Sequence, residues 1–131
     1  MANIPTGAKR EETILVTGEV AIDFLGLDGA RVLSTPHMIG FMERTCRNLL
    51  MDYLERGHDS VGTHVSVSHL AGAPIGVMVT FRAEVSAVKE RRIDFKIEAF
   101  TEAEKIGEGT HERAIINVEK FAARLAAKKP Q

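Results

Sequence analysis

Apolar and polar positions recur with two different periods along the chain. From residue 36 to about residue 56, apolar side chains return at spacings of three and four, which predicts a helix with one buried face. Thr35 is expected to cap this helix, Pro36 to open its first turn and Gly57 to end it. The expected buried stripe comprises Ile39, Met42, Cys46, Leu49, Leu50 and Tyr53.

The remaining pattern is that of strands. Residues 13–20 are rich in β-branched side chains and predict a first strand, whereas residues 21–34 lack a clear period and predict a loop with a short helical turn. The segments "VGTHVSVSHLA", "GVMVTFRAEVSAV", "IDFKIEAF" and "KIGEGTHERAIINVEKF" predict four more strands with short connections, hence an antiparallel sheet. The tail "AARLAAKKPQ" is expected to form a frayed helical turn.

This order of elements predicts an α+β fold. An amphipathic helix must bury its apolar stripe, and the sheet is the only large partner for it. We therefore expect a curved antiparallel five-stranded sheet wrapped around one long helix. A chain of 131 residues corresponds to one domain, 1–131, with residues 1–11 and 126–131 expected to be loosely ordered.

Composition narrows the range of partners and compartments. Seventeen basic side chains against 18 acidic ones give no bias toward nucleic acid or an anionic membrane, so we expect a small molecule or a protein as partner. A single cysteine, Cys46, excludes an internal disulfide and fits a reducing compartment. The start, "MANIPTGAKREE", lacks the apolar stretch of a signal peptide, so a cytoplasmic location is expected.

Glu43 interrupts the apolar stripe. It follows Ile39 by four residues and precedes Cys46 by three, which places it inside the stripe or at its edge. A buried carboxylate needs partners or must take up a proton. Two interpretations stay open: an edge position that reaches solvent or an arginine, and a functional carboxylate.

Two other side chains are expected to lie near the same helix. If Val65 and Val67 face the helix, His69 does so as well, because side chains two apart on a strand share a face. The Thr35 hydroxyl lies at the positive end of the helix dipole, where N–H groups can hold an oxyanion. Thr35, Glu43 and His69 thus form a candidate acid/base cluster, although a structural histidine and a capping threonine are the simpler alternatives.

Three rival sites are weaker. A metal site from His58, His64 and His69 is not expected, because the last two are five apart on a strand and point to opposite faces. Cys46 as a nucleophile would need a cationic neighbour, which the stripe does not predict. Asp59 and His64 have the spacing of an enoyl-CoA hydratase pair, but they lack its Asn-Pro and follow the long helix instead of preceding it.

Three motifs resemble a known family. "STPHMIGFMERTC", "VGTHVSVSHLAGAP" and "GEGTHERAIINVEKF" are similar to hot dog fold acyl-CoA thioesterases, and more narrowly to the fluoroacetyl-CoA thioesterase family, over residues 12–125. The resemblance implies a catalytic threonine, glutamate and histidine at Thr35, Glu43 and His69. It also implies substrate contacts from Gly76 and from Arg113 in "THER".

The resemblance further implies a lid before the catalytic threonine. The phenylalanines of the fluoroacetyl-specific lid would fall near Gly26 and Gly29 here, with Phe24 and Leu27 beside them as substrate contacts. The lid pattern is therefore not matched, and the acyl group is left open. The family also implies a homodimer with active sites at the subunit interface, and no cofactor beyond the coenzyme A of the substrate.

The functional hypothesis is an acyl-CoA thioesterase that hydrolyses a short or small acyl thioester. Glu43 would act as nucleophile or base, His69 would move protons, and Thr35 would orient the reacting groups. The alternative is a non-catalytic hot dog protein that binds an acyl-CoA or small acid.

Overall fold

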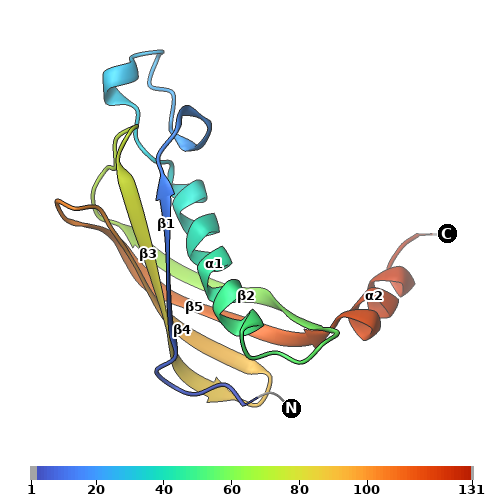
Figure 1. The fold of residues 1–131 in the computed structure, drawn as a ribbon. Helices are drawn as coiled ribbons and strands as arrows, with labels where there is room; N and C mark the ends of the chain where they lie inside the picture. The colour runs from blue at the N-terminus through green and yellow to red at the C-terminus, as the bar shows by residue number, and fades with distance from the viewer. Residues whose placement is uncertain (1–2, 131) are drawn as a thin grey trace.

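The computed structural model describes residues 3–130, which form a curved sheet and two helices (Figure 1). The chain runs through β1 (Lys9–Leu15), α1 (Thr35–Met51), β2 (His58–His69), β3 (Met78–Lys89), β4 (Arg92–Phe100), β5 (Lys105–Asn117) and α2 (Val118–Ala127). Two short 3-10 turns precede α1: Asp28–Ala30 lies in the loop where a helical turn was expected, whereas Gly18–Val20 lies within residues 13–20, which were predicted as strand, because β1 ends at Leu15. The α+β class, with a five-stranded sheet curving around one long helix, is confirmed.

The five strands pair antiparallel throughout, in the order β1-β3-β4-β5-β2. Although β3 follows β2 in sequence, β2 pairs with β5 at the opposite side of the sheet. The connection over residues 70–77 therefore crosses from one side of the sheet to the other. As a result, β2 is an edge strand with unpaired backbone groups along its outer side.

A bulge divides β2 into two halves. Gly62 pairs with Arg113 and His64 pairs with Glu112, which leaves Thr63 as an extra residue. A bulge of this kind shifts the alternation of side chains by one position. Val67 packs against the core and His69 reaches Thr35 at the start of α1, as their shared face predicts, whereas Val61 lies before the bulge and outside that series.

The start of α1 differs by one residue from the prediction. Ser34, not Thr35, is the N-cap, and its hydroxyl accepts a hydrogen bond from the His37 N–H at 3.2 Å. Pro36 accordingly occupies the second helical position instead of the first. Thr35 is the first residue of the helix, and its hydroxyl is free for another role.

The end of α1 comes earlier than Gly57, which had been expected to stop it. The helix ends at Met51, where the N–H groups of Asp52 and Tyr53 bond to carbonyls three residues back. The chain then turns so that Leu54 packs against the core before it reaches Gly57, whose φ is +85°. The turn that places Leu54 accounts for the shorter helix.

The core lies between α1 and the concave face of the sheet. Met38 and Met42 are buried there, whereas Ile39 is half-buried and Tyr53 is exposed, so the stripe is rotated slightly from its predicted position. Gly107 of β5 permits the close packing of α1, because a Cβ at this position would lie 2.7 Å from the Met38 sulfur. The largest fully buried side chains include Leu33, Leu49, Leu50, Phe81, Ile93, Phe95, Ile97 and Ile106.

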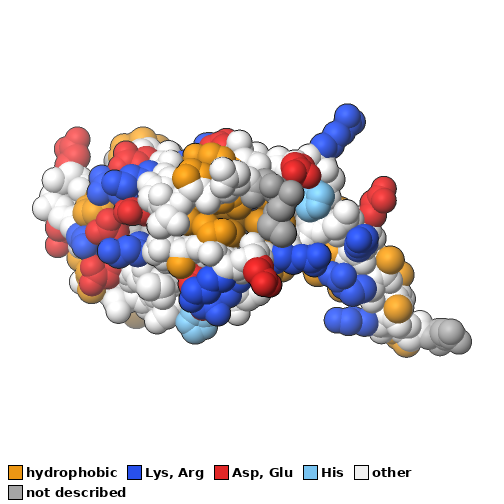
Figure 2. All heavy atoms as spheres, turned by 90° about the horizontal axis from the view of Figure 1, so that it is seen from below, with side chains coloured by type: hydrophobic (Ala, Val, Ile, Leu, Met, Phe, Trp, Pro, Cys, Tyr) orange, Lys and Arg blue, Asp and Glu red, His pale blue; other side chains and the backbone are white. Residues whose placement is uncertain are grey.

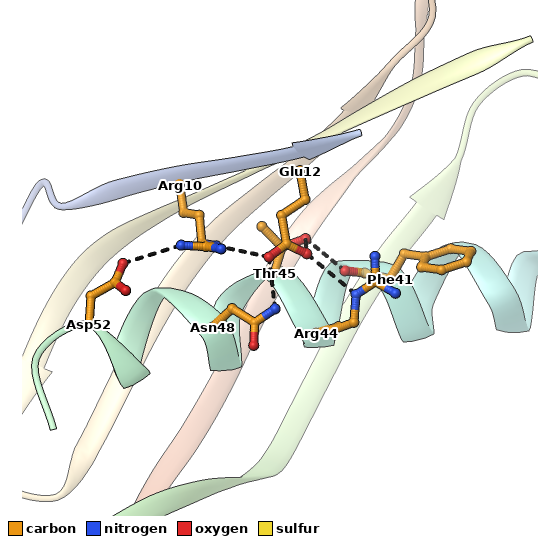
Figure 3. Close-up of polar contacts among 7 residues, drawn as sticks. All are labelled: Arg10, Glu12, Phe41, Arg44, Thr45, Asn48 and Asp52. Carbon is orange, nitrogen blue, oxygen red and sulfur yellow. Dashed lines mark hydrogen bonds and ion pairs between the residues drawn. The ribbon is translucent and has the colours of Figure 1, made fainter. Parts of the chain in front are cut away.

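A polar cluster fixes β1 to the exposed side of α1 (Figure 3). The Glu12 carboxylate accepts hydrogen bonds from Arg10 Nε and Asn48 Nδ2, both at 2.8 Å, and from Arg44 Nε at 3.4 Å. Arg10 also contacts Asp52 at 3.3 Å. We refer to Glu12 with Arg10, Arg44 and Asn48 as the Glu12 cluster.

The two ends of the chain are more ordered than expected over the described residues. The first strand begins at Lys9 rather than residue 13, and Ile4 is buried. The tail forms α2, a ten-residue helix capped by Asn117, and not a frayed turn. Figures 1 and 2 show α2 extending away from the body, and none of its residues is buried. Residues 1, 2 and 131 lie outside the described part of the chain.

Neither α1 nor α2 combines the length and the apolar character needed to cross a membrane, and the same holds for every helix within residues 3–130.

Candidate active site

The first residue of α1 meets the last residue of β2. Thr35 Oγ1 and His69 Nδ1 are 2.7 Å apart, so the two side chains share a hydrogen bond. Thr35 can make this bond because Ser34 has taken over the cap. The other ring nitrogen, His69 Nε2, is buried and has no hydrogen-bond partner within residues 3–130. Sequence reasoning correctly placed these two groups together.

Most N–H groups of the first helical turn are already engaged. Pro36 has none, the His37 N–H donates to the Ser34 hydroxyl, and the Met38 N–H donates to the Ser34 carbonyl at 2.9 Å. Among the described residues, this leaves the Thr35 N–H as the donor of that turn without an acceptor. Any negative charge held at the start of α1 would therefore be held by Thr35.

Glu43 lies two turns further along α1, at the edge of the apolar stripe. Its side chain is 41% exposed, and Oε2 lies 3.9 Å from Arg113 Nη1. The carboxylate packs directly on the backbone of β2, since a Cβ at Gly62 would lie 2.9 Å from Oε2. No hydrogen bond to this carboxylate occurs within the described chain. Glu43 thus lies at the edge of the stripe, partly exposed, with an arginine as its charged neighbour.

Arg113 is held rigidly behind Glu43. Its side chain is only 6% exposed, and it donates from Nε to Ser60 Oγ at 2.7 Å and from Nη2 to the Ser60 carbonyl at 2.9 Å. Its Nη1 donates to His111 Nε2 at 3.1 Å. Burial lowers the pKa of Arg113, but an arginine remains charged at neutral pH because its usual pKa lies far higher. Glu43 therefore faces a fixed positive charge.

A hollow of about 300 Å³ opens beside Glu43 at the edge of the sheet. It is lined by Glu43, Gly62, Thr63, His64, Val65 and His111, and we call it the Glu43 pocket. The bulge at Thr63 lies in its wall, on the strand whose outer backbone is unpaired. The pocket is therefore accessible from the outer edge of β2.

One chain does not bring Glu43 to the Thr35–His69 pair. Eight residues separate Thr35 from Glu43, which corresponds to about 12 Å along a helix. The structure instead contains two half-sites: Thr35 with His69, and Glu43 with Arg113. Each half-site pairs one residue of α1 with one residue of the sheet, His69 on β2 or Arg113 on β5.

The remaining substrate-binding candidates lie elsewhere. Gly76 is in the crossing connection, where its φ is +93° and its N–H donates to the Val16 carbonyl at 2.9 Å. The glycine that touches Glu43 is Gly62. Phe24 and Leu27 lie in the loop before α1, and both are exposed.

The residues of the rival sites have other surroundings in the structure. Cys46 is buried, and burial raises the pKa of its thiol, which makes it a poor nucleophile. Asp59 binds Arg47 through both oxygens, at 2.9 and 2.6 Å, and that hydrogen bonding lowers its pKa. No cluster of three metal-ligating side chains occurs within residues 3–130.

Sequence reasoning missed three contributors to the Glu43 half-site, Gly62, Ser60 and His111. Two signals were available. A glycine inside a strand often marks a bulge or a close approach, which describes Gly62. His111 is two residues from Arg113 on the same strand and so shares its face.

Comparison with known proteins places this arrangement in a family. Residues 16–119 match the family model of the fluoroacetyl-CoA-specific thioesterase. The fluoroacetyl-CoA thioesterase of Streptantibioticus cattleyicolor is 42% identical over 99 residues, which cover 76% of this chain and 71% of that protein.

Solved structures agree with the family match. A structure of the fluoroacetyl-CoA thioesterase superposes with a TM-score of 0.87 at 34% identity, covering 98% of this chain and 99% of the other. A variant of that thioesterase in complex with fluoroacetate and CoA gives a TM-score of 0.82 at 34% identity, covering 90% and 99%. The fold is therefore the hot dog fold of thioesterases, and the chain belongs to the fluoroacetyl-CoA-specific thioesterase family.

Proposed function

We propose that this protein is an acyl-CoA thioesterase that hydrolyses a short or small acyl thioester to the free acid and coenzyme A, with Thr35, Glu43 and His69 as its catalytic set. The observation that carries the proposal is the hydrogen bond of 2.7 Å between Thr35 and His69 at the start of α1. Family membership supports the reaction, and the relative bound to fluoroacetate and CoA supports the class of substrate.

The chemistry follows from the groups in the two half-sites. Glu43 has free acceptor capacity, so it can take a proton from water as the water oxygen adds to the thioester carbonyl. Thr35 orients the carbonyl oxygen at the helix start, where developing negative charge is stabilised. As the carbon–sulfur bond breaks, His69 passes the proton that Glu43 took from the water on to the coenzyme A thiolate, so that both side chains return to their starting state.

A carboxylate can also attack the carbonyl directly, which gives an acyl anhydride that water then cleaves. The two routes differ in the fate of oxygen atoms. If water cleaves the anhydride at the Glu43 carbonyl, single-turnover hydrolysis in H₂¹⁸O places ¹⁸O in the Glu43 carboxylate, which direct water attack cannot do. Mass spectrometry of the peptide that contains Glu43 detects this label, which identifies the anhydride route.

The complete site is proposed to form in a homodimer. Within one chain the two half-sites are about two helical turns apart, and β2 has an unpaired edge beside both. Pairing two copies along β2 would bring Glu43 of one subunit toward Thr35 and His69 of the partner subunit. A twofold interface of this kind makes two equivalent sites.

The acyl pocket is proposed to be apolar and small. Met38 and Met42 lie behind the helix start, and Phe24 and Leu27 project from the loop that precedes it. The flexible side chains of methionine adapt to several shapes. Because the lid lacks the phenylalanine pattern of the fluoroacetyl-specific enzyme, we propose small acyl groups in general as substrates.

Hydrolysis of a panel of acyl-CoA esters, followed by release of free thiol, tests the proposal. Glu43→Ala and His69→Ala serve as the disabled variants, and each is expected to lower the rate by about 10²–10⁴-fold. Full activity in both variants would refute the catalytic set. Binding of acyl-CoA by the wild-type protein without any thiol release would identify a binding protein instead.

A further inference from the structure

His111 occupies a position that the proposed reaction does not explain by itself. It lies on β5, it is buried, and its ring stacks against Phe95 with 6.1 Å between the ring centres. Nδ1 lies 2.7 Å from the carbonyl oxygen of His64. Since a carbonyl only accepts hydrogen bonds, the proton must be on Nδ1.

The second ring nitrogen is then fixed as an acceptor. His111 Nε2 lies 3.1 Å from Arg113 Nη1, and a guanidinium only donates. Both contacts are satisfied together only by a neutral imidazole with its proton on Nδ1. The two hydrogen bonds thus select one tautomer and one charge state.

The contact between His111 and Arg113 fixes the position of Nη1, the Arg113 nitrogen that faces Glu43. Ser60 takes up Nε and Nη2 of Arg113, which holds the far side of the guanidinium. Nη1 is the atom 3.9 Å from Glu43 Oε2, and His111 is its hydrogen-bond acceptor. His111 also reaches the backbone at His64, directly after the bulge that lines the Glu43 pocket.

We propose that His111 is a positioning residue, which as the neutral Nδ1–H tautomer holds Arg113 Nη1 beside Glu43 and anchors the bulge of β2. This inference rests on the proposed function, because Glu43 is the group whose position matters. His111 acts through Arg113, and so it orients the charge that faces the catalytic carboxylate.

Protonation of His111 would break the arrangement. An Nε2–H would point at an Nη1–H, so two donors and two positive charges would meet. The groups around the ring are Arg113 on β5, Glu43 on α1, the His64 carbonyl on β2 and Phe95 on β4, and the adjacent Glu112, on the other face of β5, adds only a weak electrostatic effect. Burial lowers the pKa of His111, with Arg113 adding to the effect, which keeps the ring neutral at neutral pH.

Two isosteric variants separate the two contacts. In His111→Gln, the amide oxygen lies near the position of Nε2, so the acceptor for Arg113 is kept. In His111→Asn, the amide nitrogen lies near the position of Nδ1, so only the donor to the His64 carbonyl is kept. His111→Asn is expected to lower kcat by about 10–100-fold with little change in KM, as outer contacts of catalytic groups usually do. His111→Gln is expected to retain most of the activity.

Nitrogen-15 NMR of the imidazoles in the wild-type protein supplies a readout that does not depend on activity. The proposal requires His111 to appear at neutral pH as a neutral ring with its proton on Nδ1. A charged ring, or a proton on Nε2, overturns it. Equal loss of kcat in the Asn and Gln variants, with unfolding transitions like that of the wild type, overturns it as well. If the wild-type protein hydrolyses no acyl-CoA, the proposed function fails while the NMR result still decides the state of His111.

Discussion

Two carboxylates bridge α1 and the sheet, and their surroundings differ. Glu12 reaches from β1 to α1, its side chain is 13% exposed, and it accepts four hydrogen bonds, three from the Glu12 cluster and one from Thr45 Oγ1 at 3.4 Å. Glu43 reaches from α1 toward β2 and β5, is 41% exposed, and has Arg113 at 3.9 Å as its charged neighbour. Figure 3 shows how completely the donors surround Glu12.

The difference distinguishes a structural carboxylate from a reactive one. Burial by itself would raise the pKa of Glu12, but hydrogen bonds from Asn48 and Arg10 outweigh burial, and its pKa is lowered. An acceptor whose sites are filled in this way cannot bind a water molecule or a substrate. Glu43 accepts no hydrogen bond within the described residues, so its oxygens are open to a water molecule or a substrate, while Arg113 stands beside it as a fixed positive charge.

Replacing Glu43 should produce the largest effect on activity. Glu43→Gln removes the base but leaves the shape of the side chain, so kcat should fall by about 10²–10⁴-fold. The free energy of unfolding should change by no more than about 0.5 kcal/mol, because the side chain is partly exposed. Thiol release and urea unfolding measure the two quantities. A variant that loses stability and keeps its rate would contradict the distinction.

Gly62→Ala should have the second-largest effect on activity, because it displaces the Glu43 carboxylate without removing it. The new Cβ would lie 2.9 Å from Glu43 Oε2 and 3.2 Å from His111 Cε1. A displacement of about 1 Å at a reacting group can cost about 10²-fold in rate.

Gly40→Ala is the matched control for that change, since a Cβ at Gly40 meets nothing within 4 Å. Alanine is favoured over glycine inside a helix by about 1 kcal/mol, so this variant should be slightly more stable and remain active. Comparable rates for the two variants would show that the space above Gly62 is unimportant.

Glu12→Gln should show the opposite behaviour to Glu43→Gln. Hydrogen bonds to a charged group typically contribute about 1.5–3 kcal/mol, so a loss of stability in that range is expected, with kcat retained at temperatures where the variant is folded. Denaturant unfolding checks the first part and thiol release the second. A large drop in kcat for a folded variant would assign Glu12 to the reaction.

The smallest expected effect is on how stability changes with pH. Because the pKa of Glu12 is lowered on folding, its charged form contributes stability above the unfolded pKa of about 4.3, and this contribution is lost as pH falls through the folded pKa. The stability difference between wild type and Glu12→Gln should therefore shrink between pH 7 and pH 3. A difference that grows on acidification would mean that the carboxylate is not stabilised in its charged form.

The sequence predicted the parts of the structure that follow from its periodicity. Periodicity revealed α1 and the strands, and the shared face of Val67 and His69 placed His69 at α1, where it meets Thr35 but, within one chain, not Glu43. The cap was misplaced by one residue because Ser34 and Thr35 are adjacent hydroxyl residues and both suit the role. The helix α2 was missed because its first residues continue the pattern of a strand, and no buried face distinguishes them.

The Glu43 half-site depended on features that periodicity does not contain. Its position follows from the lateral order of the strands, which places β2 beside β5, and from the bulge at Thr63, which shifts the alternation. Both arise from pairing between segments about fifty residues apart. The separation of Glu43 from Thr35 along one helix was visible in the sequence, and the proposal of a site shared between two chains rests on it.

Mixing two inactive variants tests the shared site most directly. In a dimer of Glu43→Gln with His69→Ala, one site combines the intact Glu43 of one chain with the intact His69 of the other, and the second site carries both changes. Random pairing makes half of the dimers mixed, each with one working site of two, so the account predicts recovery of about one quarter of wild-type activity. A mixture that exchanges subunits and stays as inactive as its two components would contradict it.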